Sequence, residues 1–559
     1  MGGAARSGYR AQMASSTRGP VTFGTRVALV ATLVYLVAVW IGLTTASAVG
    51  SLGPHRATYA ITASSSGIVD LGPLGTLEVD SPLPLRLGAR VTVQEVPADV
   101  TSIGAPVSLE GLSADLDRYV QFFTSPLTFV QDAAVDVARA AALHTLIAFG
   151  VLGAAAAGLY LLLGPVRRRE LGHLVARRRR TSLAGVVVVV AVAGAVVATG
   201  PLGPDMAGSR PASSIFDETP LEGARLTGRL AGIVDTYGAL ALDAYRENEA
   251  FYAGAEESLR EAWQVRAEQA EEWQRVLELS ERISPLQRVM LGDPDSLVTV
   301  VLVSDLHCNV GMAPVISAAV ELSGAQVVLD AGDTTVNGTV VERYCVTAFM
   351  NAFRAGGARE VVFAGGNHDS AVTAEQVRAA GGTVLAGEVV SVAGIDILGD
   401  VDPFETRIGQ GTRRVGDEGL AEAGERLADL ACDRDEPVPL LLVHTPAVGG
   451  PSLERGCVVA QISGHFHSWL GPQRVDQGVR LVSGSTAGAV SGQATVGPLG
   501  GTATIGVLRV SPEYGLVADY QKITVDRTGA AEVGWRMPFP LPAGMLPPPE
   551  EEGLPPGAR

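Results

Sequence analysis

The sequence predicts an α/β domain in the second half of the chain, preceded by membrane-spanning helices and a small β-rich module. Two observations support this prediction. Three long stretches within the first 204 residues contain no Asp, Glu, Lys or Arg. From Ser296 onward, short apolar runs that end in polar residues alternate with helical stretches. This second pattern is typical of strands that are buried on both faces and connected by helices.

The three uncharged stretches are predicted to be transmembrane helices. They occupy residues 27–48, 144–166 and 181–204. Each is about as long as the roughly 20 residues that a helix needs to cross a bilayer. Buried strands are much shorter than this, so buried core helices are the alternative interpretation.

The distribution of arginines predicts the orientation in the membrane. The N-terminus, residues 1–26, has four arginines and no acidic residue, and the loop 167–180 has seven arginines against one glutamate. The positive-inside rule assigns both segments to the cytoplasm. The acidic stretch 49–143 and everything after residue 204 are then extracytoplasmic, as expected for a multi-pass protein of the plasma membrane. An A-x-A-like sequence at Ala46–Ala48 leaves open that the first span is a cleaved signal peptide, which would not change this placement.

The remaining segments have simpler expected roles. Residues 49–143 alternate apolar and polar side chains and then turn helical, so they predict a β-rich module with a C-terminal helix. Residues 205–295 predict a connector and a helical stalk that packs beside the next domain. The Pro- and Glu-rich tail, residues 541–559, predicts disorder. The net charge of −17 argues against a stable nucleic-acid complex.

Candidate metal ligands follow the apolar runs of the C-terminal domain, which is expected to span residues 296–540. Five of the eight histidines of the chain lie at these run ends. Because ligands bind beyond the carboxyl ends of strands in an open α/β sheet, these side chains are expected to meet at one edge. The residues concerned are Asp305, His307, Asp333, Asn367, His368, Asp369, His444, His465 and His467.

This set of donors indicates a site for two divalent metal ions. Imidazole, carboxylate and amide oxygen suit borderline metals such as Mn, Fe or Zn. There are too many candidate ligands for one tetrahedral ion, but they suit two ions that share a bridging carboxylate. Two such ions about 3.5–4 Å apart can hold a phosphoryl group and generate hydroxide from water at neutral pH.

The segments SDLH, AGD, GGNHD, VHTP and SGHFH, in this order, resemble the motifs of the calcineurin-like metallophosphoesterase family. The resemblance covers about residues 297–525. It implies a two-sheet α+β sandwich flanked by helices, with a dinuclear metal site at one edge.

The resemblance also implies a role for each candidate residue. The first metal ion would be held by Asp305, His307 and His467, and the second by Asn367, His444 and His465. Asp333 would bridge the two ions. His368 would not bind metal but would protonate the leaving oxygen or stabilise the phosphoryl group, and Asp369 would orient it.

Two departures from the family pattern affect these expectations. Many relatives have a second acidic residue in the second motif, where this chain has Val336 followed by Asn337. The candidate ligands are still present, but the sequence does not predict which residues contact them. No additional arginine lies next to GGNHD in the sequence. A protein Ser/Thr phosphatase is therefore not favoured, because that branch of the family uses arginines to bind phosphate.

All four cysteines lie in the part of the chain that is predicted to be outside the cell. They allow three pairings in an oxidising compartment, or they remain free. Cys308 and Cys345 are expected near the site edge of the domain, and Cys432 and Cys457 near the opposite edge. The layout therefore favours the pairs Cys308–Cys345 and Cys432–Cys457.

The leading hypothesis is a membrane-anchored, outward-facing hydrolase of phosphomonoesters or phosphodiesters that uses metal-activated hydroxide. Nucleotides, cyclic nucleotides, envelope lipid head groups and wall-polymer precursors are all plausible substrates. Trp469 is either a stacking surface for a base or sugar, or a packing residue. The alternative function is a non-catalytic membrane sensor or scaffold with a structural metallophosphoesterase-like domain. A further alternative inverts the topology and puts this domain in the cytoplasm, against the arginine pattern.

Overall fold

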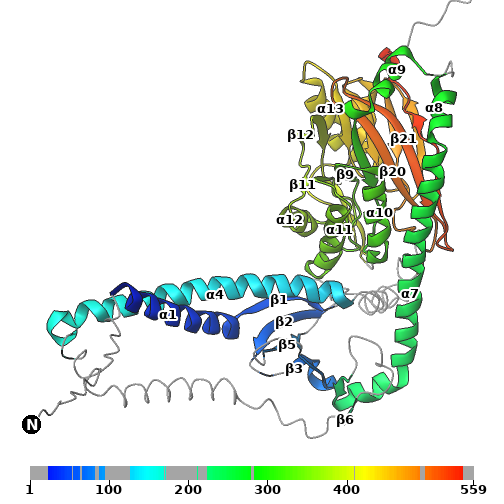
Figure 1. Cartoon of the computed structure of the whole chain (residues 1–559). Helices are drawn as coiled ribbons and strands as arrows, with labels where there is room; N and C mark the ends of the chain where they lie inside the picture. Colours follow the sequence, from blue (N-terminus) through cyan, green and yellow to red (C-terminus); the bar gives the residue numbers. More distant parts are fainter. Residues whose placement is uncertain are drawn as a thin grey trace, which may run out of the picture.

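The computed structural model describes residues 23–168 apart from 53–54, 63, 65, 82–86 and 95–125; residue 170; residues 210–211; and residues 223–545 apart from 279–282, 408–409 and 491–497. The third predicted span, the tail beyond Met545 and most of the N-terminus and arginine-rich loop therefore lie outside the described residues. Figure 1 shows a helical hairpin, a small sheet beside it, a long helix and a larger C-terminal domain.

Two long helices form the hairpin. They are α1 (Phe23–Thr45) and α4 (Pro126–Leu162). Gly42 permits a close approach, because a Cβ atom there would lie 2.0 Å from Thr145 Oγ1. Nearer the start of α1, the rings of Tyr35 and Phe149 meet edge to face with their centroids 6.1 Å apart. These two contacts show that the helices run antiparallel.

The two halves of α4 have different surroundings. Its first half packs on the small sheet, with Ala133 and Val137 buried beside Tyr59. Its second half leaves large apolar side chains exposed, among them Leu146 and Leu162. Within the described residues, the segment Ala133–Leu162 is long and apolar enough to span a membrane, and the corresponding stretch of α1, Val30–Thr45, is shorter.

The small sheet combines strands from two distant parts of the chain. Its strands are β1 (Ser47–Leu52), β2 (His55–Thr62), β3 (Ser66–Asp70), β4 (Thr76–Asp80), β5 (Gly88–Val93), β6 (Arg210–Pro211) and β7 (Arg225–Leu226). Their order is β1-β2-β5-β3-β4-β7-β6. The connector thus adds two short strands that its sequence did not predict. Leu77 pairs with Leu226, and Thr227 N–H donates a hydrogen bond to the Thr76 carbonyl.

A long helix leads from this sheet to the C-terminal domain. The helical elements here are α7 (Gly228–Glu268), α8 (Ala270–Glu278) and α9 (Pro285–Gly292). Three side chains of α7, Tyr252, Ala255 and Leu259, are buried in the core of the C-terminal domain. The helix therefore packs beside that domain along part of its length, as Figure 1 shows.

Two sheets form the centre of the C-terminal domain. The first is eight-stranded, with β8 (Val298–Val303), β9 (Val327–Asp330), β10 (Glu360–Phe363), β11 (Thr383–Val384), β20 (Ala503–Ser511), β21 (Leu516–Val525), β22 (Ala531–Val533) and β23 (Met537–Pro538). The second is six-stranded, with β12 (Glu388–Val392), β13 (Ile395–Gly399), β16 (Val438–Leu442), β17 (Val458–Ser463), β18 (Leu470–Val475) and β19 (Gly478–Val482). Strands β8 to β11 are parallel, as are β13, β16, β17 and β19.

Alternation along the strands makes this domain a four-layer sandwich. In β8, Val300 and Leu302 belong to the core between the sheets, whereas Val301 and Val303 belong to the core under the helices. Period-two alternation explains this, because successive side chains of a strand point to opposite faces. The predicted mixed α/β class with helix-flanked sheets is confirmed.

Helices cover both outer faces of the sandwich. The first sheet is covered by α7, α10 (Ala313–Ser323), α11 (Arg343–Ala355) and α12 (Ala371–Ala379), and the second by α13 (Leu420–Cys432) and α14 (Gly450–Glu454). A separate hairpin consists of β14 (Phe404–Arg407) and β15 (Gly411–Arg414). Short 3₁₀ turns occur at η1 (Gly72–Leu74), η4 (Pro294–Ser296), η5 (Val310–Met312), η6 (Val340–Glu342), η7 (Pro446–Gly449) and η8 (Ala543–Met545).

Both predicted disulfides are present in the structure. Cys308 is bonded to Cys345, and Cys432 is bonded to Cys457. The first bond joins the loop after β8 to α11, and the second joins the end of α13 to the residue before β17. The start of the predicted disordered tail is also packed on the domain, since Leu541 is buried.

Candidate metal centre

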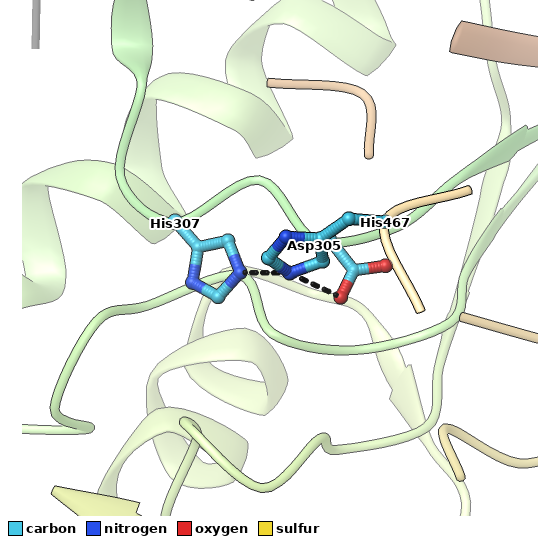
Figure 2. A group of neighbouring side chains, drawn as sticks. All are labelled: Asp305, His307 and His467. Carbon is cyan, nitrogen blue, oxygen red and sulfur yellow. Dashed lines mark hydrogen bonds and ion pairs between the residues drawn. The ribbon is translucent and has the colours of Figure 1, made fainter. Parts of the chain in front are cut away.

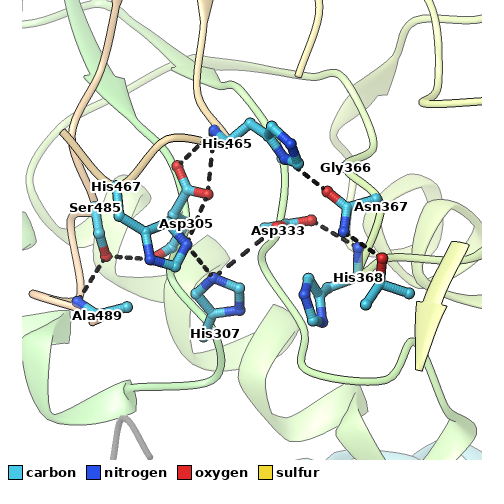
Figure 3. Close-up of polar contacts among 12 residues, drawn as sticks. Asp305, His307, Asp333, Gly366, Asn367, His368, His465, His467, Ser485 and Ala489 are labelled. Carbon is cyan, nitrogen blue, oxygen red and sulfur yellow. Dashed lines mark hydrogen bonds and ion pairs between the residues drawn. The ribbon is translucent and has the colours of Figure 1, made fainter. Parts of the chain in front are cut away.

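The candidate ligands lie at the carboxyl ends of five parallel strands. Asp305 and His307 follow β8, and Asp333 follows β9. The GGNHD segment follows β10, and the remaining histidines follow β16 and β17. Because all five strands end at one edge of the sandwich, the structure brings these side chains together, as Figure 3 shows for most of them.

The first group of ligands contains Asp305, His307 and His467 (Figure 2). The two Nε2 atoms of the histidines are 3.0 Å apart, and His467 Nε2 is 3.3 Å from Asp305 Oδ1. Asp305 is fully buried. Its carboxylate also accepts hydrogen bonds from the Ser304 hydroxyl and from the backbone N–H of His465.

The second group contains Asp333, His444 and His465, with Asn367 beside them. His444 Nε2 is 3.1 Å from Asp333 Oδ2, and its Nδ1–H donates to the carbonyl of Ala331. His465 Nδ1 is 2.9 Å from Asn367 Oδ1. The side chains that were expected to hold the second ion are therefore adjacent.

Asp333 lies between the two groups. Its Oδ2 atom is 3.1 Å from His444 Nε2 and 3.9 Å from His307 Nε2. Its Oδ1 atom accepts a hydrogen bond from the backbone N–H of His368. One carboxylate thus contacts a histidine from each group, which is the position that a bridging ligand requires.

His368 is held by the backbone of the second motif. Its Nδ1 atom is 2.8 Å from the carbonyl oxygen of Val336. A carbonyl can only accept a hydrogen bond, so Nδ1 carries the proton and Nε2 is left for other partners. The ring meets that of His307 edge to face, with centroids 5.0 Å apart. His368 is also close enough to His307 and Asp333 to form a third possible metal-binding group.

Asp369 holds the loops together instead of contacting the His368 ring. Its carboxylate accepts hydrogen bonds from the backbone N–H groups of Asp333, Thr334, Thr335 and Gly366 and from the Thr335 hydroxyl. The orienting role expected of Asp369 thus falls to Val336 in the described residues. The unexpected Val336 and Asn337 of the second motif donate their backbone N–H groups to Glu342.

The ligand loops adopt strained backbone conformations. Eight non-glycine residues among those described have positive φ, and six of them belong to or adjoin the ligand motifs: Asp305, His307, Cys308, Asp333, His465 and His467. Each left-handed conformation costs about 1–3 kcal/mol and persists only where the surrounding structure enforces it. The hydrogen bonds to Asp305 and Asp369 provide that support.

Burial and charge set the protonation of these groups. Burial lowers the pKa of His307 to about 4, so its imidazole is neutral at pH 7. Burial also opposes the charged form of His444, but the carboxylates of Asp333 and Asp305 outweigh it and raise the pKa of His444 to about 10. Burial would raise the pKa of Asp333, but the neighbouring histidines lower it below its usual value. The site therefore holds ionised carboxylates in a buried setting.

These residues fit divalent metal ions. Buried charges in proteins are either paired or coordinated to metals. Here two buried carboxylates, Asp305 and Asp333, face three imidazoles across distances of 3.1–4.0 Å. Nitrogen and oxygen donors in this mixture suit Mn, Fe or Zn. Because the Asp333 and Asp305 carboxylates raise the pKa of His444, a metal ion bound there would compete with a proton.

Two contacts that support the ligands come from outside the motifs. Tyr252 of α7 donates a hydrogen bond to Asn309 Oδ1, and the Asn309 amide donates in turn to the Tyr252 hydroxyl and the Ala487 carbonyl. A Cβ atom on Gly311 would lie 2.2 Å from the Tyr252 ring, so α7 approaches the ligand loop closely. Asn309 lies two residues after the first motif, but no local signal marks Tyr252.

Arg407 of β14 is the second residue that the sequence did not reveal. Its guanidinium donates hydrogen bonds to the carbonyls of His368 and Asp369. The neighbouring Thr406 hydroxyl accepts from the Asn367 amide. An arginine thus lies next to GGNHD in space, but it is directed at backbone carbonyls and its side chain is only 13% exposed. It is not an open phosphate-binding group.

Trp469 is used for packing. Its ring stacks on Tyr520, with an interplanar angle of 23°, and its Nε1–H donates to the Gly471 carbonyl. The sequence left open whether Trp469 offers a stacking surface to a base or sugar. These contacts favour the packing role.

Replacing Tyr252 by Phe is expected to weaken metal binding. The change removes the hydroxyl that holds Asn309 and leaves a buried amide without that partner. Loss of a hydrogen bond behind a ligand typically costs about 10–100-fold in metal affinity. Manganese titration of the full chain measures this, with Tyr514→Phe, in the turn between β20 and β21, as the control. Equal affinities for both variants would show that the Tyr252 hydroxyl does not position the ligand loop.

No family model and no curated protein matches the chain. Several solved structures resemble it at low identity. An archaeal phosphodiesterase is 16% identical over 41% of this chain and 99% of its own, with a TM-score of 0.25. A 5'-nucleotidase precursor from Thermus thermophilus is 16% identical over 43% of this chain and 54% of its own, with a TM-score of 0.28. A dimetal phosphatase from Danio rerio is 13% identical over 44% of this chain and 99% of its own, with a TM-score of 0.29. At these TM-scores the likenesses do not bear on activity, and the chain spans only about half of the nucleotidase.

Proposed function

We propose that the C-terminal domain is a metal-dependent phosphoesterase that hydrolyses phosphomonoesters or phosphodiesters. The observation that carries the proposal is the position of Asp333, whose carboxylate lies between a histidine of one ligand group and a histidine of the other. A shared carboxylate between two sets of imidazole and oxygen donors is the arrangement that two-metal hydrolysis requires.

The proposed ligands are those expected from the sequence. One ion is assigned to Asp305, His307 and His467, and the other to Asn367, His444 and His465, with Asp333 shared. When bound, such ions neutralise phosphoryl charge and make a nucleophile available from water at neutral pH. The protein contributes the positions of the donors. Positive-φ loops and the hydrogen bonds to Asp369 hold these donors before substrate arrives.

His368 is proposed to be the proton donor to the leaving oxygen. Its Nδ1–H donates a hydrogen bond to the Val336 carbonyl, so Nε2 is the atom that can hold a proton for the substrate. The backbone N–H of the same residue is bonded to Asp333, which fixes the ring relative to the shared ligand. Asp369 and Arg407 hold the segment that carries it.

The test is hydrolysis by the manganese-loaded full chain, with His368→Ala compared on two leaving groups. General acid catalysis contributes about 10²–10⁴-fold and matters most when the leaving group is poor. We expect the variant to lose about 10²-fold or more on an alkyl phosphate ester but much less on a p-nitrophenyl ester, which needs no proton. Equal losses on both esters would contradict the role of His368 as a general acid. Absence of hydrolysis by the manganese-loaded wild type would contradict the proposed function.

We further propose that the protein spans the membrane three times, with this domain outside. The exposed apolar side chains of α1 and α4 support insertion into lipid. Pairing of β4 with β7 keeps residues 76–80 and 225–226 on one side, so the chain between them must cross an even number of times. The predicted spans 144–166 and 181–204 meet this requirement. Two disulfides are typical of an oxidising compartment.

A further inference from the structure

The edge of the C-terminal domain that carries the candidate metal ligands faces the small sheet formed by β1 to β7. His368 Nδ1 is bonded to the Val336 carbonyl, and the Val336 N–H donates to Glu342 of η6. The same turn, η6, contacts β1. Strand β1 begins at Ser47, two residues after α1 ends at Thr45. A short series of contacts thus connects the proposed acid to the end of the first candidate span.

An ion pair joins this edge to the hairpin. Arg343, the first residue of α11, lies 2.7 Å from Asp136 of α4, in the arrangement of α11 over α4 that Figure 1 shows. The polar end of the hairpin is marked by His144, whose Nδ1 is 3.1 Å from Thr45 Oγ1. Asp136 precedes His144 by eight residues, about 12 Å along the helix at 1.5 Å per residue. Tilt of the helix would only make the height of Asp136 above His144 smaller than this length.

Apolar side chains are exposed on the same edge. Phe466 lies between two of the ligands, is 51% exposed and has its ring centroid 5.7 Å from that of His465. Val340 of η6, the turn that contacts β1, is 52% exposed. Acyl chains or the region beneath lipid head groups would cover both side chains.

We infer that the phosphate ester cleaved at this site is carried by a membrane lipid, with the phosphate at the bilayer surface. The inference rests on the proposed phosphoesterase function and on insertion of the α1–α4 hairpin. The oxygen of water bonds to phosphorus and water releases one proton to solvent. The bond from phosphorus to the lipid oxygen breaks, that oxygen takes the proton from His368, and His368 regains a proton from solvent. The products are a lipid alcohol and phosphate, or a lipid alcohol and a phosphate monoester when the substrate is a diester.

The first test compares one ester in two settings. The full chain is inserted into phosphatidylcholine nanodiscs that contain phosphatidic acid or phosphatidylglycerol, loaded with manganese and assayed for turnover. Water-soluble dibutyryl forms of both lipids at the same bulk concentration, and p-nitrophenyl phosphate, are assayed in parallel. Confinement of enzyme and substrate to one bilayer raises the effective concentration, so the long-chain ester is expected to turn over about 10²-fold faster than its dibutyryl form.

The second test alters the contact that holds the site near the bilayer. Arg343→Glu puts a like charge opposite Asp136 and is expected to lower turnover of the nanodisc lipid about fivefold while leaving p-nitrophenyl phosphate turnover unchanged. The double variant with Asp136→Arg restores the attraction and should recover the loss. Arg434→Glu is the matched control, since Arg434 pairs with Asp396 at the same distance of 2.7 Å on another part of the domain.

The outcomes separate this inference from the proposed function. Hydrolysis of p-nitrophenyl phosphate without preference for the nanodisc lipid would overturn the lipid substrate and leave the phosphoesterase intact. A loss in Arg343→Glu that is equal for lipid and soluble ester would also overturn it. No hydrolysis of any ester by the loaded wild type would overturn the proposed function, and the inference with it.

Discussion

Replacing Asp333 by Ala is expected to abolish hydrolysis while leaving the domain folded. The carboxylate lies between His307 and His444, so its loss removes the only side chain proposed to contact both ions. Loss of a two-metal arrangement costs several kcal/mol of transition-state stabilisation, about 10³-fold or more in kcat/KM. The measurement is hydrolysis of bis(p-nitrophenyl) phosphate by the manganese-loaded full chain.

The control for this variant is Asp396→Ala. Asp396 also forms an ion pair within the domain, with Arg434, but it lies at the start of β13 away from the ligands. We expect it to retain wild-type turnover. If Asp333→Ala were as active as Asp396→Ala at full metal loading, the shared-ligand role would be incorrect.

Replacing Asp369 by Asn is expected to have the largest effect on stability. The carboxylate accepts four backbone N–H groups and the Thr335 hydroxyl, and all of these lie in buried loops. An amide offers one accepting oxygen and turns a donor toward the remaining N–H groups, which leaves buried donors unsatisfied. The expected loss is about 3 kcal/mol, which corresponds to a fall in Tm of roughly 5–10 °C for a domain of this size.

Thermal unfolding of the full chain in detergent measures this effect. Asp526→Asn is the comparison, because Asp526 also accepts backbone N–H groups, from Thr528 and Ala530, but in an exposed turn. Its Tm should remain within about 2 °C of the wild type. A comparably small shift for Asp369→Asn would mean that the loops do not depend on that carboxylate.

The clustering of the candidate ligands could be predicted from sequence because each lies within a few residues of the end of a buried strand. Strand ends such as those at Asp305 and Asp333 are marked by a local change from apolar to polar residues, and parallel strands bring their ends to one edge. The disulfides followed from the same layout. The mixed α/β class needed only the alternation of strands and helices.

The contacts that support the ligands could not be predicted, because they join elements far apart in sequence. Tyr252 lies on a helix whose sequence indicates only an amphipathic surface, and Arg407 lies on a two-stranded hairpin outside both main sheets. Val336 acts through its carbonyl, which every residue type has. The pairing of β7 with β4 depends on the return of the chain after the arginine-rich loop.

For the first half of α4, hydropathy could not distinguish a contact with the small sheet from a contact with lipid. Hydropathy marked a span near residues 144–166, but the helix begins at Pro126 and packs on the small sheet through Ala133, Val137 and Ala141. Small apolar residues such as Ala133 fit a close helix–sheet contact as well as they fit lipid. Only the sheet beside them distinguishes the two environments.

The most direct test of the central claim is the number of manganese ions per chain at which hydrolysis of bis(p-nitrophenyl) phosphate saturates. The metal-free full chain is titrated with manganese while bound metal and turnover are measured on the same sample. The geometry predicts that turnover reaches its maximum at two bound ions and is lost on chelation. Two bound ions without turnover, or turnover that survives complete removal of metal, would contradict a two-metal phosphoesterase.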